Sequence, residues 1–195
     1  MEFVFDIDKA VAAAAYVTKR CGKEISGFIL IKILYGAERD ALASWHRPIT
    51  GDSFVSMKKG PVLSRIYDLI KGSVLSTNSD MVKWSKHFSP RKSNNNIELI
   101  AEPDFRFLSK RETAVLEKSA QHISSLIKQH GLIADVLHHE WPEWKDPSDC
   151  GKGAIPLTLE EVLSEVIEDE SFVEKIVSEI KAVAGAKAAL QISPA

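Results

Sequence analysis

Cysteine and long apolar runs are both scarce in the sequence. The two cysteines among the 195 residues are Cys21 and Cys150, which lie far apart. A disulfide framework is therefore not expected, and a reducing cytoplasm fits this composition. The strongest apolar run, "FILIKIL", is interrupted by Lys32 and falls far short of the roughly 18 residues that a membrane span needs. The acidic start "MEFVFDID" does not look like a signal peptide, so the sequence predicts a cytoplasmic protein without a membrane partner.

Neither sign of charge dominates the composition. The chain has 25 Lys and Arg residues and 27 Asp and Glu residues, which gives a net charge of −2. This balance argues against nucleic acid as a partner. Basic residues do gather around Trp84 and Phe88, but we interpret them as the solvated face of a helix that buries its Trp. The basic residues of this cluster are Lys83, Lys86, His87, Arg91 and Lys92.

Motifs for metal binding and nucleophilic catalysis are absent as well. The sequence has no Cys-x-x-Cys, His-Glu-x-x-His or Gly-x-Ser-x-Gly pattern. His138 and His139 are adjacent, and adjacent side chains on a helix point about 100° apart, so both rarely reach one ion. One of them is instead expected to pack beside Trp141 and Trp144. We therefore predict no metal, no cofactor and no catalytic residue.

Two segments carry glycine beside lysine, as phosphate-binding loops do. They are "GDSFVSMKKGPV" and "DCGKGA". The first lacks the required glycine spacing, and Pro61 removes one backbone donor from it. The second lacks both the upstream glycine and the Ser or Thr that would follow the lysine. Neither segment predicts a nucleotide site of the P-loop type.

Apolar residues recur at helical spacing through most of the chain. The expected helices cover residues 8–21, 26–46, 61–71, 80–88, 109–131 and 133–141. Their expected N-terminal caps include Asp8, Ser26, Asp80 and Ser109, the last in a capping box with Glu112. "SFVSM" and "IELIAEPD" read as strands between helices. The predicted fold is α+β and mainly α, a helical domain with a small two- or three-stranded sheet.

The second expected helix, from Ser26 to about His46, should bury one face. The apolar residues of that face are Leu30, Leu34, Ala37, Ala41 and Trp45. Glu38, Arg39 and Asp40 are placed by the same periodicity towards the opposite side.

The C-terminal part of the chain has a different character. "PEWKDPSDCGKGAIP" reads as a boundary, which divides the chain into a domain of residues 1–150 and an extension of residues 151–195. Two capping boxes, Thr158 with Glu161 and Ser171 with Glu174, predict an amphipathic helical hairpin in the extension. Its apolar stripes must bury against the main domain or another chain. The hairpin could complete the core, form a homodimer or add specificity for a partner.

The central stretch resembles a known family. "IKILYGAERD", followed by "RPITGDSFVSMKKGPVLSRIYDLIKG", is similar to the Panacea domain, also called the SocA-like antitoxin domain. The resemblance covers roughly residues 8 to 146, with Ser56 and Leu63 as mild departures from it. The residues that match the family pattern are Leu34, Tyr35, Ala37, Glu38, Pro48, Ile49, Thr50, Gly51, Asp52, Phe54, Met57, Gly60, Pro61, Val62, Ile66, Tyr67 and Asp68. His139 and Trp144 match its weaker closing motif.

The resemblance implies an antitoxin of a toxin–antitoxin pair, in a prokaryote or its phage and in the setting of phage defence. Such a protein neutralises a cognate protein toxin by direct protein–protein contact, and some relatives deliver the toxin to a cellular protease. It implies neither enzymatic activity nor a cofactor. Within the motif, Tyr35, Glu38, Thr50, Gly51, Gly60, Pro61, Tyr67, His139 and Trp144 are expected to form the scaffold. The expected toxin-contact residues are Asp52, Lys58, Lys59 and Arg65.

Two other classes of function were weighed against this one. A metal-dependent hydrolase or nucleic-acid enzyme would need carboxylates and His139 to converge in one cleft. An operator-binding repressor would need a helix-turn-helix, which the sequence does not show.

Overall fold

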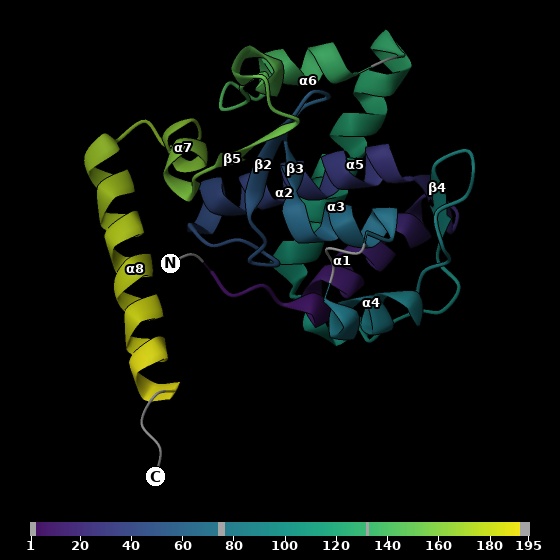
Figure 1. Ribbon diagram of the computed structural model, residues 1–195, viewed down its shortest axis with the longest axis horizontal. Helices are drawn as coiled ribbons and strands as arrows, with labels where there is room; N and C mark the ends of the chain where they lie inside the picture. The colour runs from purple at the N-terminus through teal and green to yellow at the C-terminus, as the bar shows by residue number, and fades with distance from the viewer. Residues whose placement is uncertain (1–2, 74–76, 132, 192–195) are drawn as a thin grey trace.

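The computed structural model describes residues 3–73, 77–131 and 133–191 of the chain. Helix α2 (Gly27–Trp45) lies at the centre and is contacted by α1 (Ile7–Arg20) and α5 (Lys110–His130) (Figure 1). Side chains on several faces of α2 are buried, among them Leu30, Ile31, Ile33 and Leu34. A helix that is apolar on more than one face belongs in the interior, because each face then finds a packing partner. The shorter helices of this part are α3 (Ser64–Lys71), α4 (Asn78–Ser85) and α6 (Ala134–Glu140).

Two small antiparallel sheets flank the helices. In one, β1 (Glu24–Ser26) pairs with β4 (Asn96–Glu98). In the other, β2 (Phe54–Met57) lies between β3 (Val62–Leu63) and β5 (Ala154–Leu157). The mainly helical fold with small sheets and the strands in "SFVSM" and "IELIAEPD" are confirmed, although the two strands belong to different sheets. Strand β5 was not expected from the sequence. It lies in the expected extension but pairs with β2 of the expected domain, and the division at residue 150 stays a prediction.

Several helix ends differ from those expected. The N-terminal cap of α1 is Asp6 rather than Asp8, since the Asp6 carboxylate accepts a hydrogen bond from the backbone N–H of Lys9. Thr77 rather than Asp80 caps α4 in the same way. The side chain of Ser26 makes no capping bond to α2. For α1 and α4, residues able to cap a helix lie two or three positions apart, and the sequence alone does not distinguish between them.

Two further boundaries were wrong. Pro61 does not begin a helix: it leads into β3, and α3 starts at Ser64. Ser171 does not cap α8 (Glu170–Gln191), because Asp169 accepts the hydrogen bond from the backbone N–H of Phe172 instead. The capping boxes of Ser109 with Glu112 and of Thr158 with Glu161 are confirmed.

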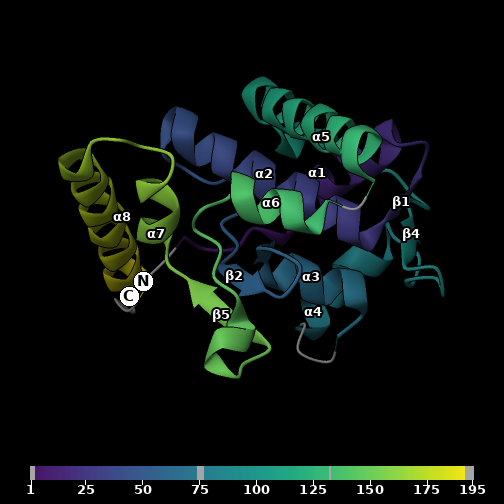
Figure 2. The same ribbon diagram turned by 90° about the horizontal axis from the view of Figure 1, so that it is seen from above.

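The C-terminal hairpin is confirmed as two helices, α7 (Leu159–Ser164) and α8. Both views show α8 on one side of the molecule, with α7 between it and the helical core (Figures 1 and 2). Val162, Leu163, Val173 and Ile176 are buried, and the ring of Phe172 meets the ring of His46 edge-on at 5.0 Å. The apolar stripe of the hairpin therefore packs on the C-terminal end of α2 and extends the core.

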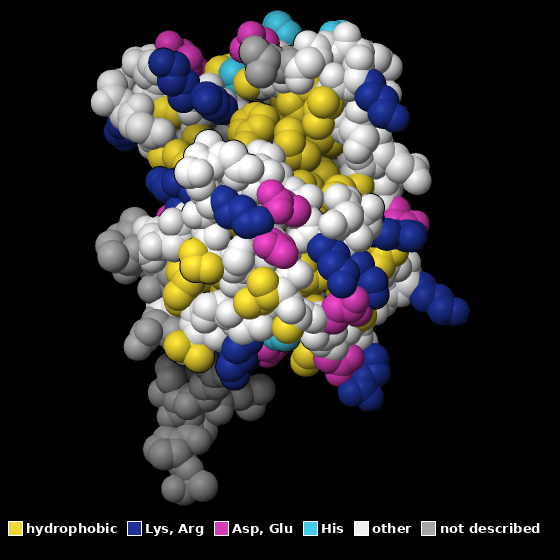
Figure 3. Space-filling model, turned by 90° about the vertical axis from the view of Figure 1, so that its right-hand side faces the viewer, with side chains coloured by type: hydrophobic (Ala, Val, Ile, Leu, Met, Phe, Trp, Pro, Cys, Tyr) yellow, Lys and Arg dark blue, Asp and Glu magenta, His cyan; other side chains and the backbone are white. Residues whose placement is uncertain are grey.

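Trp84 and Phe88 are both buried and stack with ring centroids 4.2 Å apart. The basic residues around them thus surround a packed pair, as expected. On the face shown in Figure 3, hydrophobic side chains gather in a hollow in the upper half, and Lys and Arg side chains lie around its margin. Within the described residues, no helix combines the length and the apolar character needed to cross a membrane.

Candidate functional site

The turn "PITG" is held against α2 by Glu38. This carboxylate, 1% exposed, accepts hydrogen bonds from the backbone N–H groups of Ile49 and Thr50 and from the Thr50 hydroxyl. Burial raises the pKa of Glu38 to about 7. The expectation that Glu38 faces away from the core was wrong. It faces inward because the turn supplies three donors, which a buried carboxylate needs.

Asp52 organises the next part of the motif. Its side chain, 5% exposed, accepts hydrogen bonds from the backbone N–H groups of Ser53 (2.8 Å), Arg65 (3.1 Å) and Ile66 (2.9 Å). Asp52 therefore caps α3 from outside the helix, which explains a start at Ser64 rather than at Pro61. Burial raises the pKa of Asp52 to about 6. Because its carboxylate oxygens are engaged inside the protein, Asp52 is not available for contact with a partner protein.

Lys32 fixes the second turn of the motif. Its side chain is 1% exposed, and its Nζ donates a hydrogen bond of 2.7 Å to the carbonyl oxygen of Pro61. A Cβ added to Gly60, which has a φ of +92°, would lie 2.9 Å from that Nζ. Glycine is thus required at position 60 by both its backbone angle and the ammonium beside it. Burial lowers the pKa of Lys32 to about 7.

The closing segment is tied to α2 and β2. Glu143, 3% exposed, accepts hydrogen bonds from the Tyr35 hydroxyl (2.7 Å) and from Nε of Arg39 (2.9 Å). Burial, together with the Glu143 carboxylate, holds the pKa of Tyr35 well above its ordinary value. Trp144 donates from Nε1 to the carbonyl oxygen of Met57 at 2.8 Å. These bonds lock the segment after α6 onto the sheet.

One of the two adjacent histidines packs against a Trp, as expected. His138 stacks on Trp144 with ring centroids 3.5 Å apart and planes 3° apart. His139, the residue matched to the closing motif, is exposed on α6. Of the other expected scaffold residues, Tyr67 is half-buried and Gly51 has a φ of +71° and abuts the backbone of Val4.

The four expected contact residues are not brought together. Lys58 and Lys59 are exposed at the turn between β2 and β3, and Asp52 is buried. Arg65 forms an ion pair with Asp80, and its guanidinium lies 4.2 Å from the centre of the Phe5 ring. Arg65 is exposed but engaged in this way, whereas Lys58 and Lys59 are exposed and, within the described residues, form no ion pair.

Sequence reasoning missed Lys32 and Glu143 as organising residues. Lys32 was visible as a charge inside an apolar run, which is the usual signal of a buried lysine with a dedicated acceptor. Glu143 offered no such signal, because its hydrogen-bond donors lie on α2, more than a hundred residues away in sequence.

Residues 30–145 match the family described as "Antitoxin SocA-like, Panacea domain". The chain belongs to this family. The match begins in α2 and ends just after Trp144, so it spans every buried charge described above and leaves out β5, α7 and α8. Neither the curated proteins nor the solved structures contain a match to the chain.

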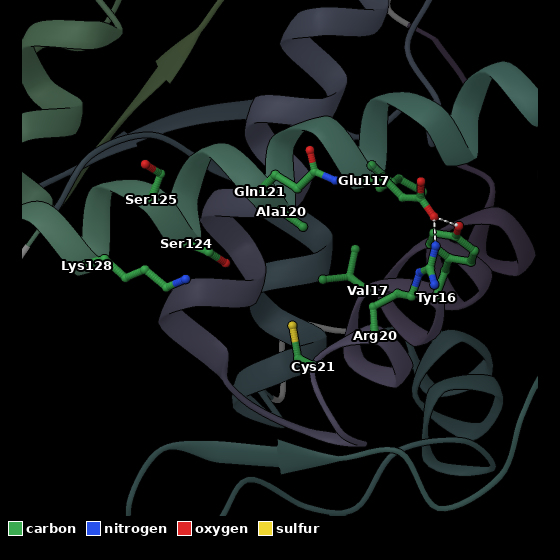
Figure 4. Close-up of a pocket in the computed structure, with 11 residues that line it drawn as sticks. Tyr16, Val17, Arg20, Cys21, Glu117, Ala120, Gln121, Ser124, Ser125 and Lys128 are labelled. Carbon is green, nitrogen blue, oxygen red and sulfur yellow. Dashed lines mark hydrogen bonds and ion pairs between the residues drawn. The ribbon is translucent and has the colours of Figure 1, made fainter.

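One groove of this Panacea domain lies between α1 and α5. It has a volume of about 550 Å³, with Tyr16 and Arg20 converging on Glu117 at one end and Lys128 at the other (Figure 4). Cys21 also lines it, but burial raises the pKa of that thiol, so it is not an activated nucleophile. Within residues 3–73, 77–131 and 133–191, no three His, Cys, Asp or Glu side chains are placed to hold a metal ion.

A second cavity lies beside the turn that carries Lys58 and Lys59. Its volume is about 460 Å³, and it is lined by the start of α2, the end of α3 and the loop at residues 91–95. Lys32 also belongs to its lining. The exposed turn of the Panacea motif is therefore next to a cavity rather than on a flat surface.

Proposed function

We propose that this Panacea domain is an antitoxin that neutralises a cognate protein toxin by direct binding, rather than by catalysis. Membership of an antitoxin family carries the proposal. One feature of the structure is compatible with it: three buried charged groups of the motif bind the protein's own backbone. Glu38, Asp52 and Lys32 all do so. What remains for a partner is the exposed surface that these groups hold in place.

We place the toxin contact at the turn between β2 and β3. Lys58 and Lys59 are exposed there, and within the described part of the chain neither forms an ion pair. The turn is anchored on both sides, by Trp144 at the Met57 carbonyl and by Lys32 at the Pro61 carbonyl. A surface fixed before binding loses less conformational entropy when the complex forms.

The hairpin and the fate of the toxin belong to the same proposal. Phe172 and Val183 on α8 are large apolar side chains left partly exposed, and both line a groove with Trp45. They are candidates for a homodimer contact or for added toxin specificity. Delivery of the toxin to a cellular protease, in the cytoplasm, would need a further surface of this chain that contacts the protease.

The function is tested by growth. The open reading frame next to this gene is expressed in cells with and without the antitoxin, and growth and co-purification are measured. We expect the neighbour alone to stop growth and the pair to restore it, with both proteins in one complex. A harmless neighbour, or toxicity that persists beside well-expressed Panacea domain, would contradict the proposal.

The contact face is tested by charge reversal. The variant Lys58→Glu/Lys59→Glu should lower toxin affinity at least tenfold and abolish growth rescue, because it replaces two exposed cations in the proposed face. The matched control is Lys86→Glu/Lys110→Glu, which makes the same change of charge at two exposed positions elsewhere. Full rescue by the first variant would remove this turn from the contact face.

A further inference from the structure

The cavity beside the β2–β3 turn has an uneven charge. Five of its lining side chains are basic and none is acidic, although the whole chain has more acidic than basic residues. The basic side chains are Lys32, Lys58, Lys59, Lys71 and Arg91. They come from α2, the β2–β3 turn, the end of α3 and the loop before β4. Four separate segments of the chain thus contribute basic side chains to one cavity.

Most of these basic side chains carry a full charge at neutral pH, but burial lowers the pKa of Lys32 to about 7, so that side chain is only partly protonated there. Lys58 interacts electrostatically with the Asp146 carboxylate, without a direct ion pair. In the described part of the chain none of the five forms an ion pair, whereas lysines elsewhere, such as Lys9, Lys83 and Lys145, pair with carboxylates. The ammonium of Lys32 can donate three hydrogen bonds, and the structure gives it one acceptor, the carbonyl oxygen of Pro61. A net positive charge in a concave site concentrates anions there.

The N-terminus of α2 opens into the same cavity. Ser26, Gly27 and Phe28 line it, and the Ser26 side chain makes no capping bond to the first turn. Gly27 donates its N–H to the Asn95 carbonyl, but the cap position is left without a side-chain acceptor. The N-terminus of a helix of 19 residues carries partial positive charge that favours an anion. This partial charge adds to that of the five basic side chains and comes from an independent source.

The remaining lining is apolar or amide. Phe28, Met57, Val62, Tyr67 and Ile70 supply a hydrophobic wall that includes two aromatic rings. Asn94 and Asn95 lie at the side of the loop before β4 and carry amide groups that can hydrogen-bond the edge of a base. A volume of about 460 Å³ lies within the range of small-molecule sites.

We propose that this cavity is a binding site for a phosphorylated small molecule with an aromatic body, of the nucleotide class. The phosphates lie against the lysines and the start of α2, and the aromatic body lies against Phe28 and Tyr67. The site does not use a P-loop. Gly60 and Gly153, from the two glycine-containing segments of the sequence, both line it, but as walls rather than as a phosphate cradle. The site shares Lys58 and Lys59 with the proposed toxin contact, but small-molecule binding is measured without a toxin, so it can fail or succeed separately from the antitoxin function.

The test uses the purified full-length chain and isothermal titration calorimetry at low ionic strength. The probes are ATP, adenosine, inorganic phosphate and a short poly-glutamate peptide. We expect ATP to bind at least tenfold more tightly than each of the other three, because only ATP engages both the cations and the apolar wall. Equal affinity for ATP and the peptide would overturn the proposal and favour an acidic protein segment. No binding of ATP would also overturn it.

Two variants locate the site. Lys58→Glu/Lys59→Glu should weaken ATP at least tenfold through charge, and Gly153→Trp should do so by filling the cavity without changing charge. A side chain at position 153 is tolerated, because an added Cβ meets no atom within 4 Å. The control, Lys86→Glu/Lys110→Glu, should change ATP affinity less than twofold, and thermal unfolding confirms that each variant is folded. An equal loss in the control, or full affinity in Gly153→Trp, would overturn the assignment to this cavity.

Discussion

The motif segment, residues 46–72, and the C-terminal hairpin, α7 with α8, are attached to the same core in different ways. Buried charged side chains hold the first: Glu38, Asp52 and Lys32 each bind backbone groups of that segment. The second is held by an apolar stripe that includes Val162 and Val173, with an exposed ion pair between Lys145 and Glu161 beside it. Apolar burial stabilises a contact but leaves its geometry loose, whereas buried hydrogen bonds permit one arrangement of the chain.

The difference predicts unequal responses to mutation. A buried donor that loses its acceptor costs its full desolvation energy, so the motif should respond sharply to single changes. An apolar stripe loses stability in proportion to the area removed, so the hairpin should respond gradually.

The largest effect is expected from Glu38→Ala. It leaves three donors of residues 49 and 50 without an acceptor, and each costs about 1 kcal/mol or more, so the free energy of unfolding should fall by more than about 3 kcal/mol. Urea denaturation measures this. Glu174→Ala, at an exposed position of α8, is the control and should change stability by less than about 0.5 kcal/mol. A loss in Glu38→Ala no larger than in the control would show that the turn does not depend on this carboxylate.

The next effect is a dependence of stability on pH. The folded-state pKa of Glu38, about 7, lies above its ordinary value of 4.5, so its stabilising contribution is complete below pH 4.5 and is lost as the pH rises through 7. Asp52 acts in the same direction, with a folded-state pKa of about 6. Lys32, whose pKa is lowered to about 7, contributes stability above its ordinary pKa of 10.5 and loses it as the pH falls through 7.

These three groups together predict a minimum of stability near pH 7. Between pH 5 and pH 7 the contribution of Glu38 should fall by about 2 kcal/mol, as urea titrations at several pH values can measure. Glu38→Gln cannot titrate, so its stability should decline less over this interval than that of the unaltered protein. Parallel curves for the two proteins would show that Glu38 does not titrate there.

The smallest effect is expected in the hairpin. Val173→Ala removes two methyl groups from the buried side of α8 and should lower the free energy of unfolding by about 1.5 kcal/mol. Val183→Ala, on the exposed side of the same helix, should change it by less than about 0.5 kcal/mol. If Val173→Ala costs more than Glu38→Ala, the proposed contrast between the two regions is wrong.

Much of the helical fold could be predicted because its signals are local. The capping box of Ser109 and Glu112, the glycine after α3 and the alternation in "SFVSM" each concern residues a few positions apart. Their physical causes act within one turn or one strand, so a single sequence contains them.

The site could not be predicted to the same extent, because its contacts join distant segments. The helical periodicity predicted that Glu38 faces solvent. Periodicity within one helix contains no information about the hydrogen-bond donors that residues 49 and 50 supply. Similarly, β5 is a short strand whose partner β2 lies about a hundred residues earlier, and its proline gave no strand signal. The cavity with its five cations exists only once four segments are assembled.

The buried charged side chains determine which positions of this sequence can tolerate substitution. Lys32, Glu38, Asp52 and Glu143 are occupied with the protein's own backbone and side chains, so a substitution at any of them damages the whole molecule. Lys58 and Lys59 are exposed and have no such structural role. Substitutions at the turn can therefore accumulate without loss of the fold. Under the proposed function, such substitutions would change which toxin the protein binds while the scaffold stays the same.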